Sequence, residues 1–355
     1  MTLQHFTDNA FSEWMKGGGP DADIVISSRI RIARNIKEFP FPIMASAQQS
    51  RAVLEKVLKS LNNDALHQIS KFAFVNLADL PDLQKRVLVE KHLISPSLAE
   101  ESRNGAVIIS ENESISIMIN EEDHLRIQVL YPGLQINEAW RLASRIDDLF
   151  EASLDYAFDE QRGYLTSCPT NVGTGIRASV MMHLPALVIT QQIGRMLSAI
   201  TQVGLAVRGL YGEGSEATGN LFQISNQITL GQSEEEIIDN LHSVTRQIIE
   251  HERAARKSLL EHSKAKIYDR VNRSLGILAY AGIIDSKEAA QRLSDVRLGI
   301  DIGLISGVSA NAMNELMVMT QPGFLQQYAG RMLSADERDI RRAELIRHRL
   351  RTKDK

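Results

Sequence analysis

The segment from residue 106 to residue 131 constrains the fold more than any other part of this chain. It contains three runs rich in β-branched and apolar residues, AVIIS, SISIMIN and LRIQVLY, separated by short breaks. Runs of this composition with short connections are typical of consecutive strands joined by tight turns. The sequence therefore predicts an antiparallel meander, and with it a domain built on a β-sheet.

The connection between the second and third runs is unusual for a turn. It holds Glu121, Glu122 and Asp123 in succession, followed by His124. Adjacent like charges repel one another and resist burial, and a surface turn more often uses Gly, Asn or Pro. Taken alone, the stretch fits either a solvated acidic turn or a functional group of carboxylates.

Weaker signals organise the rest of the chain. Residues 48–62 and 135–158 have the apolar spacing of helices, whereas 24–28, 204–209 and 221–230 are β-prone. A further helix starts at Ser233, which forms a capping-box pattern with Glu236. Strand signals stop after about residue 260, and residues 285–350 have the pattern of several helices, broken at 307–309, 321–323 and 329–331. We therefore predict an α+β fold, with an antiparallel sheet flanked by helices over residues 1–255 and an all-helical C-terminal domain over 256–355.

Composition excludes several classes of protein. With 43% hydrophobic and 24% charged residues the chain has an ordinary globular composition, and its net charge of −4 offers no basic field for direct nucleic-acid binding. The first residues lack the features of a signal peptide, and no apolar run approaches the roughly 18 residues that span a bilayer. The single cysteine, Cys168, permits no intrachain disulfide. These features predict a cytoplasmic protein that does not bind membranes.

Arginines stand near the ends of predicted strands and loops. Arg29 and Arg31 in SSRIRIAR would share one face of an extended segment, because side chains alternate with a period of two. Arginine binds phosphate through planar, often bidentate hydrogen bonds and keeps its charge. Several arginines converging from separate segments could therefore hold a polyphosphate; the alternative is that each is an isolated surface residue. The arginines concerned are Arg29, Arg31, Arg126, Arg177 and Arg208.

Two glycine-rich stretches bear on nucleotide binding. GTGIRA (173–178) formally matches the dinucleotide pattern G-x-G-x-x-A, but a polar segment precedes it and no acid follows at the required spacing. GLYGEGSEATGN (209–220) is typical of a mobile loop or lid. The chain contains no P-loop pattern, which excludes that kind of nucleotide site.

Cys168 lies in a polar loop, TSCPTNVGTG. A passive cysteine is one interpretation; a Cys–His nucleophile is another, with His183 the nearest histidine but no pattern that brings the two together. The histidines show no zinc-ligand spacing, and a second cysteine is absent. The sequence therefore predicts no protein-built metal site.

Six motifs resemble, in this order along the chain, those of the phosphagen (guanidino) kinases, which phosphorylate creatine or arginine. They are SSRIRIAR, INEEDHLRI, SCPTNVGTGIRASV, LPAL, VRGLYGEG and FQISN. The resemblance covers roughly residues 24–255, and it is closer still to the bacterial protein-arginine kinases, where it runs nearly end to end. Two departures from the metabolic kinases fit that branch. Few residues precede SSRIR, so the N-terminal domain that embraces small guanidino substrates is expected to be missing, and a helical C-terminal domain is added.

The resemblance implies transfer of the γ-phosphoryl group of ATP to arginine guanidinium groups of proteins. A guanidinium stays protonated, with a pKa above about 12, so carboxylates must orient it and accept a proton as the new bond forms. By the match to the family, Glu122 is the main catalytic base and Glu121 stands beside it. Glu213 matches the second substrate carboxylate, and Cys168 matches the active-site cysteine that helps to orient the guanidinium.

The same resemblance implies a nucleotide site. The five arginines hold the phosphates, and His92 lies near the base or ribose. Mg²⁺ is held mainly through phosphates and water, so protein ligands to a metal are not expected. The implied nucleotide contacts are Ser27, Ser28, Arg29, Ile30, Arg31, His92, Arg126, Arg177, Ala178, Ser179, Val180, Met181, Arg208, Gly209, Leu210, Tyr211 and Gly212.

A further motif, RDIRRA, begins at Arg338. It matches the R-D-x-x-R-A motif with which protein-arginine kinases bind phosphoarginine as an allosteric signal, which implies contacts from Arg338, Asp339 and Arg342. The residues themselves also fit a solvated charged helix after a Ser334–Glu337 capping box, or a nonspecific anion-binding tail.

The resemblance also implies partners. They are protein substrates with exposed arginines, an McsA-type activator, a ClpC-type unfoldase and a second copy of the chain in a homodimer or larger assembly. Phosphorylated proteins would be marked for degradation by Clp proteases in the stress response. Two alternatives stay open: a kinase for free arginine or small guanidines, and a phosphoarginine-binding protease adaptor. The intact acids, cysteine and arginines disfavour the adaptor as the sole function.

Overall fold

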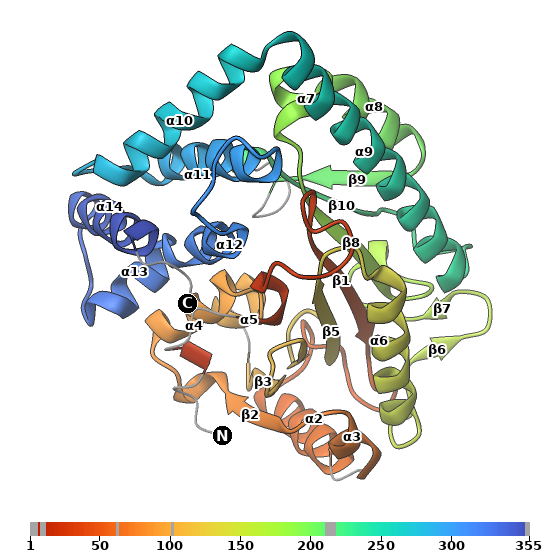
Figure 1. Cartoon of the computed structure of the whole chain (residues 1–355). Helices are drawn as coiled ribbons and strands as arrows, with labels where there is room; N and C mark the ends of the chain where they lie inside the picture. The colour runs from red at the N-terminus through yellow and green to blue at the C-terminus, as the bar shows by residue number, and fades with distance from the viewer. Residues whose placement is uncertain (1–5, 8–11, 62–63, 101–102, 210–217, 352–355) are drawn as a thin grey trace.

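The computed structural model describes residues 6–7, 12–61, 64–100, 103–209 and 218–351 (Figure 1). Within these residues the chain forms an eight-stranded antiparallel sheet with the strand order β2-β3-β4-β5-β1-β8-β10-β9, and a separate hairpin of β6 and β7. The strands are β1 (Val25–Arg34), β2 (Phe72–Asn76), β3 (Ala106–Ser110), β4 (Ile115–Ile119), β5 (Leu125–Pro132), β6 (Phe158–Asp159), β7 (Gly163–Tyr164), β8 (Ile176–His183), β9 (Leu205–Arg208) and β10 (Leu221–Asn226).

The predicted meander is confirmed, because β3, β4 and β5 are consecutive antiparallel neighbours. The β-prone run predicted at 24–28 is longer than expected: β1 continues to Arg34 and becomes a central strand, paired with β5 on one side and β8 on the other. Ile30 and Ile32 of β1 are fully buried, and alternate positions carry arginine. This central position places Arg29 and Arg31 inside the sheet.

Helices cover the sheet and connect its strands. The N-cap Ser233 and Glu236 form the predicted capping box, with reciprocal N–H···O distances of 3.1 and 2.8 Å. The helix predicted at 135–158 ends at Glu151, followed by the poor helix formers Ser153 and Asp155. The elements are η1 (Glu13–Met15), α2 (Ala47–Ser60), α3 (Asp64–Ile69), η2 (Leu77–Asp79), α4 (Asp82–Glu90), α5 (Pro96–Glu100), α6 (Ile136–Glu151), η3 (Pro169–Asn171), α7 (Pro185–Ile189), α8 (Ile193–Gln202), η4 (Thr218–Asn220) and α9 (Glu234–His262).

The described part of the chain after α9 is helical, as predicted. Ser309 caps α12, Pro322 begins α13, and Gly330, with φ of 67°, ends α13 in the left-handed conformation that favours glycine. These residues lie at the predicted breaks. The helices are α10 (Lys264–Tyr280), α11 (Ser286–Asp301), α12 (Ala310–Met319), α13 (Pro322–Ala329) and α14 (Ala335–Arg351).

The sheet and the C-terminal helices have separate cores that meet at a shared cluster. Ala255 and Leu259 of α9 pack in the core of the sheet, whereas Ile267 of α10 packs in the core of the C-terminal helices. A third cluster joins Met181 of β8 to Phe324 of α13. The predicted boundary between residues 255 and 256 falls within α9, which is one continuous helix, and stays a prediction.

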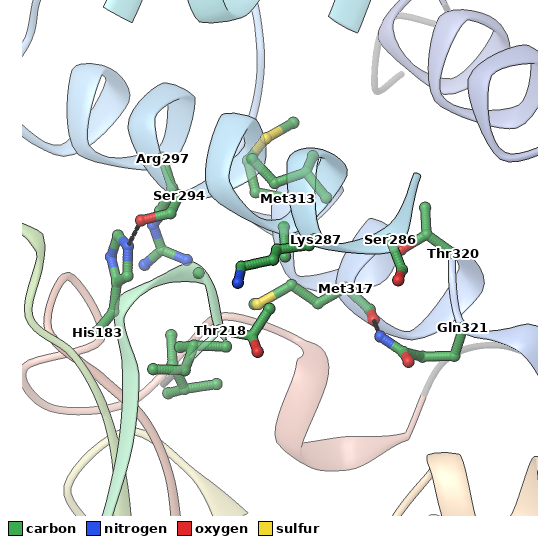
Figure 2. A pocket seen from close by; sticks show the side chains of 15 residues that line it. His183, Thr218, Ser286, Lys287, Ser294, Arg297, Met313, Met317, Thr320 and Gln321 are labelled. Carbon is green, nitrogen blue, oxygen red and sulfur yellow. Dashed lines mark hydrogen bonds between the residues drawn. The ribbon is translucent and has the colours of Figure 1, made fainter. Parts of the chain in front are cut away.

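A cavity of about 190 Å³ lies at this junction, where α11 and α12 approach β8 and β10 (Figure 2). His183 Nε2 of β8 is 2.8 Å from Ser294 Oγ of α11, and Asn220 Nδ2 donates to the same oxygen at 2.7 Å. Burial lowers the pKa of His183 well below its ordinary value, so the imidazole is neutral near pH 7. Neutral hydrogen bonds and apolar packing thus join the two parts of the molecule.

Among the residues that the structure describes, no helix is both long enough and apolar enough to cross a membrane.

Candidate active site

The acidic stretch forms the turn between β4 and β5, and its members lie in different environments. Asn120, with φ of 55°, opens the turn, and its N–H donates to His124 O at 3.0 Å. Asp123 and His124 are fully buried, whereas the side chain of Glu122 is 41% exposed. The interpretation as a solvated acidic turn is therefore wrong, because half of the Glu121–His124 segment is inside the protein.

Asn35, immediately after β1, anchors the buried half of the turn. Its Nδ2 donates to Asp123 Oδ1 at 2.7 Å, and its Oδ1 accepts the N–H of His124 at 2.9 Å. Asp123 Oδ1 also accepts the N–H of Ser167 at 2.7 Å. Burial raises the pKa of Asp123, and these hydrogen bonds oppose the rise. The anchored turn directs Glu121 and Glu122 toward the surface of the sheet.

Arg126 of β5 holds both glutamates. Its Nη1 donates to Glu121 Oε1 at 2.7 Å and its Nη2 to Glu122 Oε2 at 2.8 Å. Ser95 Oγ donates to Glu121 Oε1 at 2.6 Å, and the Glu121 side chain is only 2% exposed. Glu121 is therefore fixed, and Glu122 is the carboxylate that an incoming group can reach.

Strand register places the five arginines on one face of the sheet. Residues directly opposite each other on neighbouring strands point to the same face. Arg31 of β1 lies opposite Arg177 of β8, and Ala33, two residues further along β1, lies opposite Arg126 of β5. Arg29 of β1 lies opposite Ser179 of β8, and Ser179 lies opposite Ser225 of β10. Ser225 lies opposite Ala206 of β9, and Gln223, two residues before Ser225, lies opposite Arg208. Arg29 and Arg208 therefore point to the same face as the other three arginines. The prediction that Arg29 and Arg31 share a face is confirmed, and the alternative of isolated surface arginines is wrong.

Concentrated positive charge defines the electrostatics of this face. Burial, together with Arg126 and Arg177, lowers the pKa of Arg29 to about 10. Burial and the neighbouring arginines lower the pKa of Arg31 well below its ordinary value. Arg31 Nε is buried and has no hydrogen-bond partner among the described residues. Like charges held together in this way are unfavourable unless an anion binds between them, so the face is suited to a polyanion.

Two adjoining pockets open on the arginine face. One, of about 380 Å³, is lined by Arg31, Arg126, Arg177, Arg208, Glu122 and Cys168. The other, of about 160 Å³, is lined by Arg29, Arg31, Arg126, Arg208 and His92. Three arginines are common to both, so the pockets form one continuous site with the reachable glutamate at one end and His92 at the other.

Cys168 lies in the first pocket, half-buried, with Sγ 3.0 Å from Thr170 Oγ1. His183 lies elsewhere, beside Ser294 at the junction with α11. The structure therefore gives no support to a Cys–His nucleophile. It brings Cys168 together with Glu122 instead, as two separate groups around one pocket.

The predicted nucleotide residues of β1 and β8 divide between the two faces of the sheet. Ser27, Ser179 and Met181 point to the same face of the sheet as the arginines. Four residues point to the opposite face and are fully buried: Ser28, Ile30, Ala178 and Val180. The side chains of these four residues face away from the arginine pockets, so a nucleotide could approach them only through their backbone.

His92 is half-buried, with φ of 60° and its ring 5.4 Å from the ring of Trp14. Burial and the nearby Arg29 and Arg31 lower its pKa to about 3, so the ring is neutral near pH 7. Gly209 is buried at the end of β9. Leu210, Tyr211, Gly212 and Glu213, which the sequence assigns to the site, lie outside the described residues.

The three residues of the C-terminal motif lie together on α14. Arg342 is 2% exposed and donates to Thr320 O and Ile284 O, each at 3.0 Å, and it also pairs with Asp339. Arg338 is half-buried and donates to Leu333 O at 3.1 Å. Arg342 thus fastens α14 to two neighbouring loops, a role that sequence reasoning missed. Ser334 and Glu337 form the predicted capping box.

Sequence reasoning also missed Asn35 and Ser95, which set the position of the glutamates. Asn35 follows the arginine-rich strand directly, but no local pattern connects it with Asp123 in a distant turn. Ser95 precedes α5, where a serine has the ordinary interpretation of a helix cap; its Oγ does accept the N–H of Leu98 at 3.1 Å.

Family models match two consecutive parts of the chain. The model of the ATP:guanido phosphotransferase C-terminal catalytic domain matches residues 52–255, and the model of the protein-arginine kinase McsB C-terminal domain matches residues 264–355. The chain therefore belongs to the ATP:guanido phosphotransferase family. Within this family it is a protein-arginine kinase, as its relatives along the full length indicate.

Three relatives named protein-arginine kinase illustrate the similarity. That of Brevibacillus brevis is 63% identical, covering 99% of this chain and 98% of the relative; that of Halalkalibacterium halodurans is 64% identical, covering 100% and 99%. That of Bacillus subtilis is 57% identical, covering 99% and 96%.

Solved structures share the fold at lower identity. Lombricine kinase has a TM-score of 0.57 at 24% identity, covering 67% of this chain and 68% of its own. The duplicated taurocyamine kinase from Schistosoma mansoni, with bound transition state analog components, has a TM-score of 0.58 at 21% identity, covering 76% and 39%. The antiparallel sheet flanked by helices is thus the fold of these kinases.

Proposed function

We propose that this protein-arginine kinase transfers the γ-phosphoryl group of ATP to arginine side chains of substrate proteins. One observation carries the proposal: five arginines share one face of the sheet, and a reachable glutamate lies at its edge. The arginines suit a polyphosphate, and the carboxylate suits a guanidinium. Phosphoryl transfer depends mainly on positioning and on charge stabilisation, which this arrangement supplies.

The arginines act on the phosphates in this proposal. Arg31, Arg126 and Arg208 line both pockets and so would contact the phosphate chain along its length, with Arg177 at the γ end beside Glu122. His92 would lie near the base or ribose. Fixed guanidinium groups stabilise the charge that spreads over the equatorial oxygens as the terminal group moves.

When bound, Mg²⁺ would neutralise part of the charge of the phosphates that the arginines hold. Within the described ranges, no three His, Cys, Asp or Glu side chains gather as a metal-binding group. By the family resemblance, such an ion is held mainly by phosphate oxygens and water. The chain's own contribution is then to hold the phosphates to which the ion binds.

Glu122 is the base in this mechanism. A guanidinium nitrogen attacks the γ-phosphorus, the bond from phosphorus to the bridging oxygen of ADP breaks, and the proton lost by the nitrogen passes to the Glu122 carboxylate. Glu121, held by Arg126 and Ser95, would fix the orientation of the guanidinium beside it. Cys168 lies in the same pocket and would contact the guanidinium without forming a covalent bond. Glu213 would supply a second carboxylate.

The test compares acceptors and a variant. Purified protein is incubated with ATP, Mg²⁺ and casein, and in parallel with free arginine, and the products are read by intact mass spectrometry without acid because the P–N bond is acid-labile. We expect phosphate on casein arginines, reduced roughly 100-fold or more in Glu122→Gln. Phosphate on free arginine alone would favour the small-guanidine kinase. Phosphoarginine binding without transfer to either acceptor would favour the adaptor.

We also propose that the products are marked for degradation by Clp proteases in the stress response, in the cytoplasm. The proposal includes an McsA-type activator, a ClpC-type unfoldase and a homodimer or larger assembly. Its support is the family resemblance and the match of the C-terminal family model to residues 264–355. Arg338, Asp339 and Arg342 would bind phosphoarginine as an allosteric signal. Arg338 and Asp339 are half-buried and can be reached in part, and the buried Arg342 would also hold α14 in place.

A further inference from the structure

A third pocket adjoins the active site beside Glu121 and Glu122, and it also shares Arg31, Ser95, Pro96 and Arg126 with the pocket of His92. Its volume is about 640 Å³, against about 380 Å³ for the pocket that contains Cys168. Arg31, Glu122 and Arg126 line both, so the two spaces are continuous. A guanidinium group beside Glu122 therefore has its remaining chain in or near this larger space, which we call the acceptor groove. It is lined further by Pro42, Ile43, Pro96, Arg103, Asn120 and Ser167.

We propose that the acceptor groove binds the polypeptide on either side of the acceptor arginine. In this proposal Asn120 accepts a hydrogen bond from the substrate, and Ile43 and Met44 contact an apolar side chain next to the arginine. The inference rests on the proposed function, and it adds a specificity: arginines flanked by apolar residues in accessible segments are preferred to arginines in polar surroundings.

Asn120 provides a built polar contact. Its Nδ2 donates to Ser50 O at 2.8 Å and to Asn104 O at 3.2 Å, so both amide hydrogens are used. Because both of these partners are carbonyl oxygens, the other atom of the amide must be the oxygen. This Oδ1 is buried and has no hydrogen-bond partner among the described residues. The residue as a whole is 2% exposed, and it lines the groove. A buried acceptor without a partner is unfavourable, and a donor N–H from a bound chain would satisfy it.

Ser167 adds a second polar group of the same kind. Its Oγ is buried, and its hydroxyl interacts with the carboxyl of Asp123, which leaves the oxygen able to accept a further hydrogen bond. It lines the groove, and its backbone N–H is fixed by Asp123 Oδ1 at 2.7 Å. A hydroxyl that donates to a carboxylate can still accept, so it can bind a main-chain N–H. Two buried acceptors of this type suit an extended peptide, whose main-chain N–H groups are donors.

An apolar rim completes the groove. Ile43 and Met44 are 82% and 78% exposed, on the loop between β1 and α2. The loop is held in place, since Met44 N donates to Phe41 O at 2.8 Å and Arg103 Nη1 donates to Ala45 O at 3.4 Å. Ile43 lines the groove together with Glu122, and Met44 follows it on the same ordered loop, so these apolar side chains are suited to contact with a substrate side chain. The continuity of the groove with the active site identifies the occupant as the substrate chain.

The experiment measures kcat and KM for casein with the full-length protein. The variants are Ile43→Ser/Met44→Ser and, as a matched control, Ile283→Ser, whose side chain is 66% exposed on the loop before α11. We expect KM for casein to rise about tenfold in the double variant, with little change in kcat or in the Kd for ATP, and no change in the control. Unchanged KM in the double variant would overturn the inference.

A pair of capped peptides makes the specificity explicit: Ser-Leu-Arg-Leu-Ser and Ser-Ser-Arg-Ser-Ser. The natural chain is expected to phosphorylate the first about tenfold more efficiently in kcat/KM, and the double variant is expected to treat both alike. A preference that persists in the double variant would contradict a role for Ile43 and Met44. If the natural chain phosphorylates neither casein nor either peptide, the proposed function itself fails; if it phosphorylates both peptides equally, only the groove inference fails.

Asn120 is tested separately with Asn120→Gly, because glycine adopts the positive φ of this position without strain. We expect KM for casein to rise several-fold, roughly threefold to tenfold, while the Kd for ATP stays unchanged. An equal loss of ATP binding would indicate that Asn120 only supports the turn between β4 and β5, and would remove it from the proposal.

Discussion

Arg31 shows how a residue that serves binding can oppose folding. It lies on the central strand β1 opposite Arg177, and burial and the arginines around it lower its pKa. Its Nε is buried without a hydrogen-bond partner among the described residues. Half-buried cations in one cluster repel one another and lose hydration. The cluster therefore destabilises the folded protein until an anion binds to it.

Replacing Arg31 by methionine should therefore separate stability from function. We expect Arg31→Met to raise the free energy of unfolding without nucleotide by about 1 kcal/mol, because repulsion is removed. The Kd for ATP should rise roughly 10- to 100-fold. Urea denaturation and calorimetric titration measure the two quantities. Arg273→Met, at an arginine whose side chain is 75% exposed, is the control and should change neither. A less stable Arg31→Met protein would contradict the argument.

At the scale of elements, α4 and α13 are joined by a buried carboxylate. Glu90 ends α4, and its two oxygens accept the N–H groups of Gly323 and Phe324 in the first turn of α13, at 2.7 and 2.9 Å. A Cβ on Gly323 would lie 2.8 Å from Glu90 Oε2, so glycine is required for this approach. Burial raises the pKa of Glu90 to about 7, and the two N–H groups oppose the rise.

This contact predicts a pH dependence of stability. A carboxyl whose folded pKa lies above its unfolded value, here about 7 against 4.5, binds its proton more tightly in the folded protein. Stability is then greatest below pH 4.5 and falls as the pH rises toward 7. Relative to the non-titrating Glu90→Gln, the natural chain should lose about 3 kcal/mol across this window. Urea denaturation between pH 4 and pH 8 measures the difference, and a constant difference would contradict the prediction.

At the scale of the whole molecule, the sheet and the C-terminal helices are held together by Arg297 of α11. Its guanidinium donates to Ala22 O before β1 and to Asn314 Oδ1 of α12, each at 2.6 Å, and to Asp301 at 3.0 Å. It is 4% exposed. The shared apolar cluster around Met181 and Phe324 adds to this connection. One cooperative unit is therefore expected, although the molecule has separate cores.

Removing this connection should divide the unfolding transition. Arg297→Ala leaves Asp301 without its close partner in a buried setting, a change that typically costs about 3–5 kcal/mol. We expect one calorimetric transition in the natural chain and two in the variant, with the C-terminal helices unfolding first because their core is smaller. Arg292→Ala, at a half-exposed residue of the same helix, serves as the control. A single transition shifted to lower temperature would show that the cores do not depend on Arg297 for their coupling.

Local patterns in the sequence predicted the meander, the capped helices at Ser233 and Ser334, the breaks between C-terminal helices and the common face of Arg29 and Arg31. Each of these features depends on residues a few positions apart, through side-chain alternation, capping hydrogen bonds or the backbone preferences of Gly and Pro. The motifs also identified Glu121, Glu122 and Cys168 as members of one site, and the structure brings the last two into one pocket.

Tertiary structure alone decided how these parts meet. Arg177 lies opposite Arg31 only because β8 pairs with β1 in one register, and Asp123 is buried because Asn35 and Ser167 reach it from distant segments. The burial of Arg342 depends in the same way on two loops packed against α14. Strand order and register follow from burial over the whole chain, which no short window of sequence contains. The chemistry was thus visible in the residues, whereas its geometry, and the groove beside it, came from the packing of the sheet.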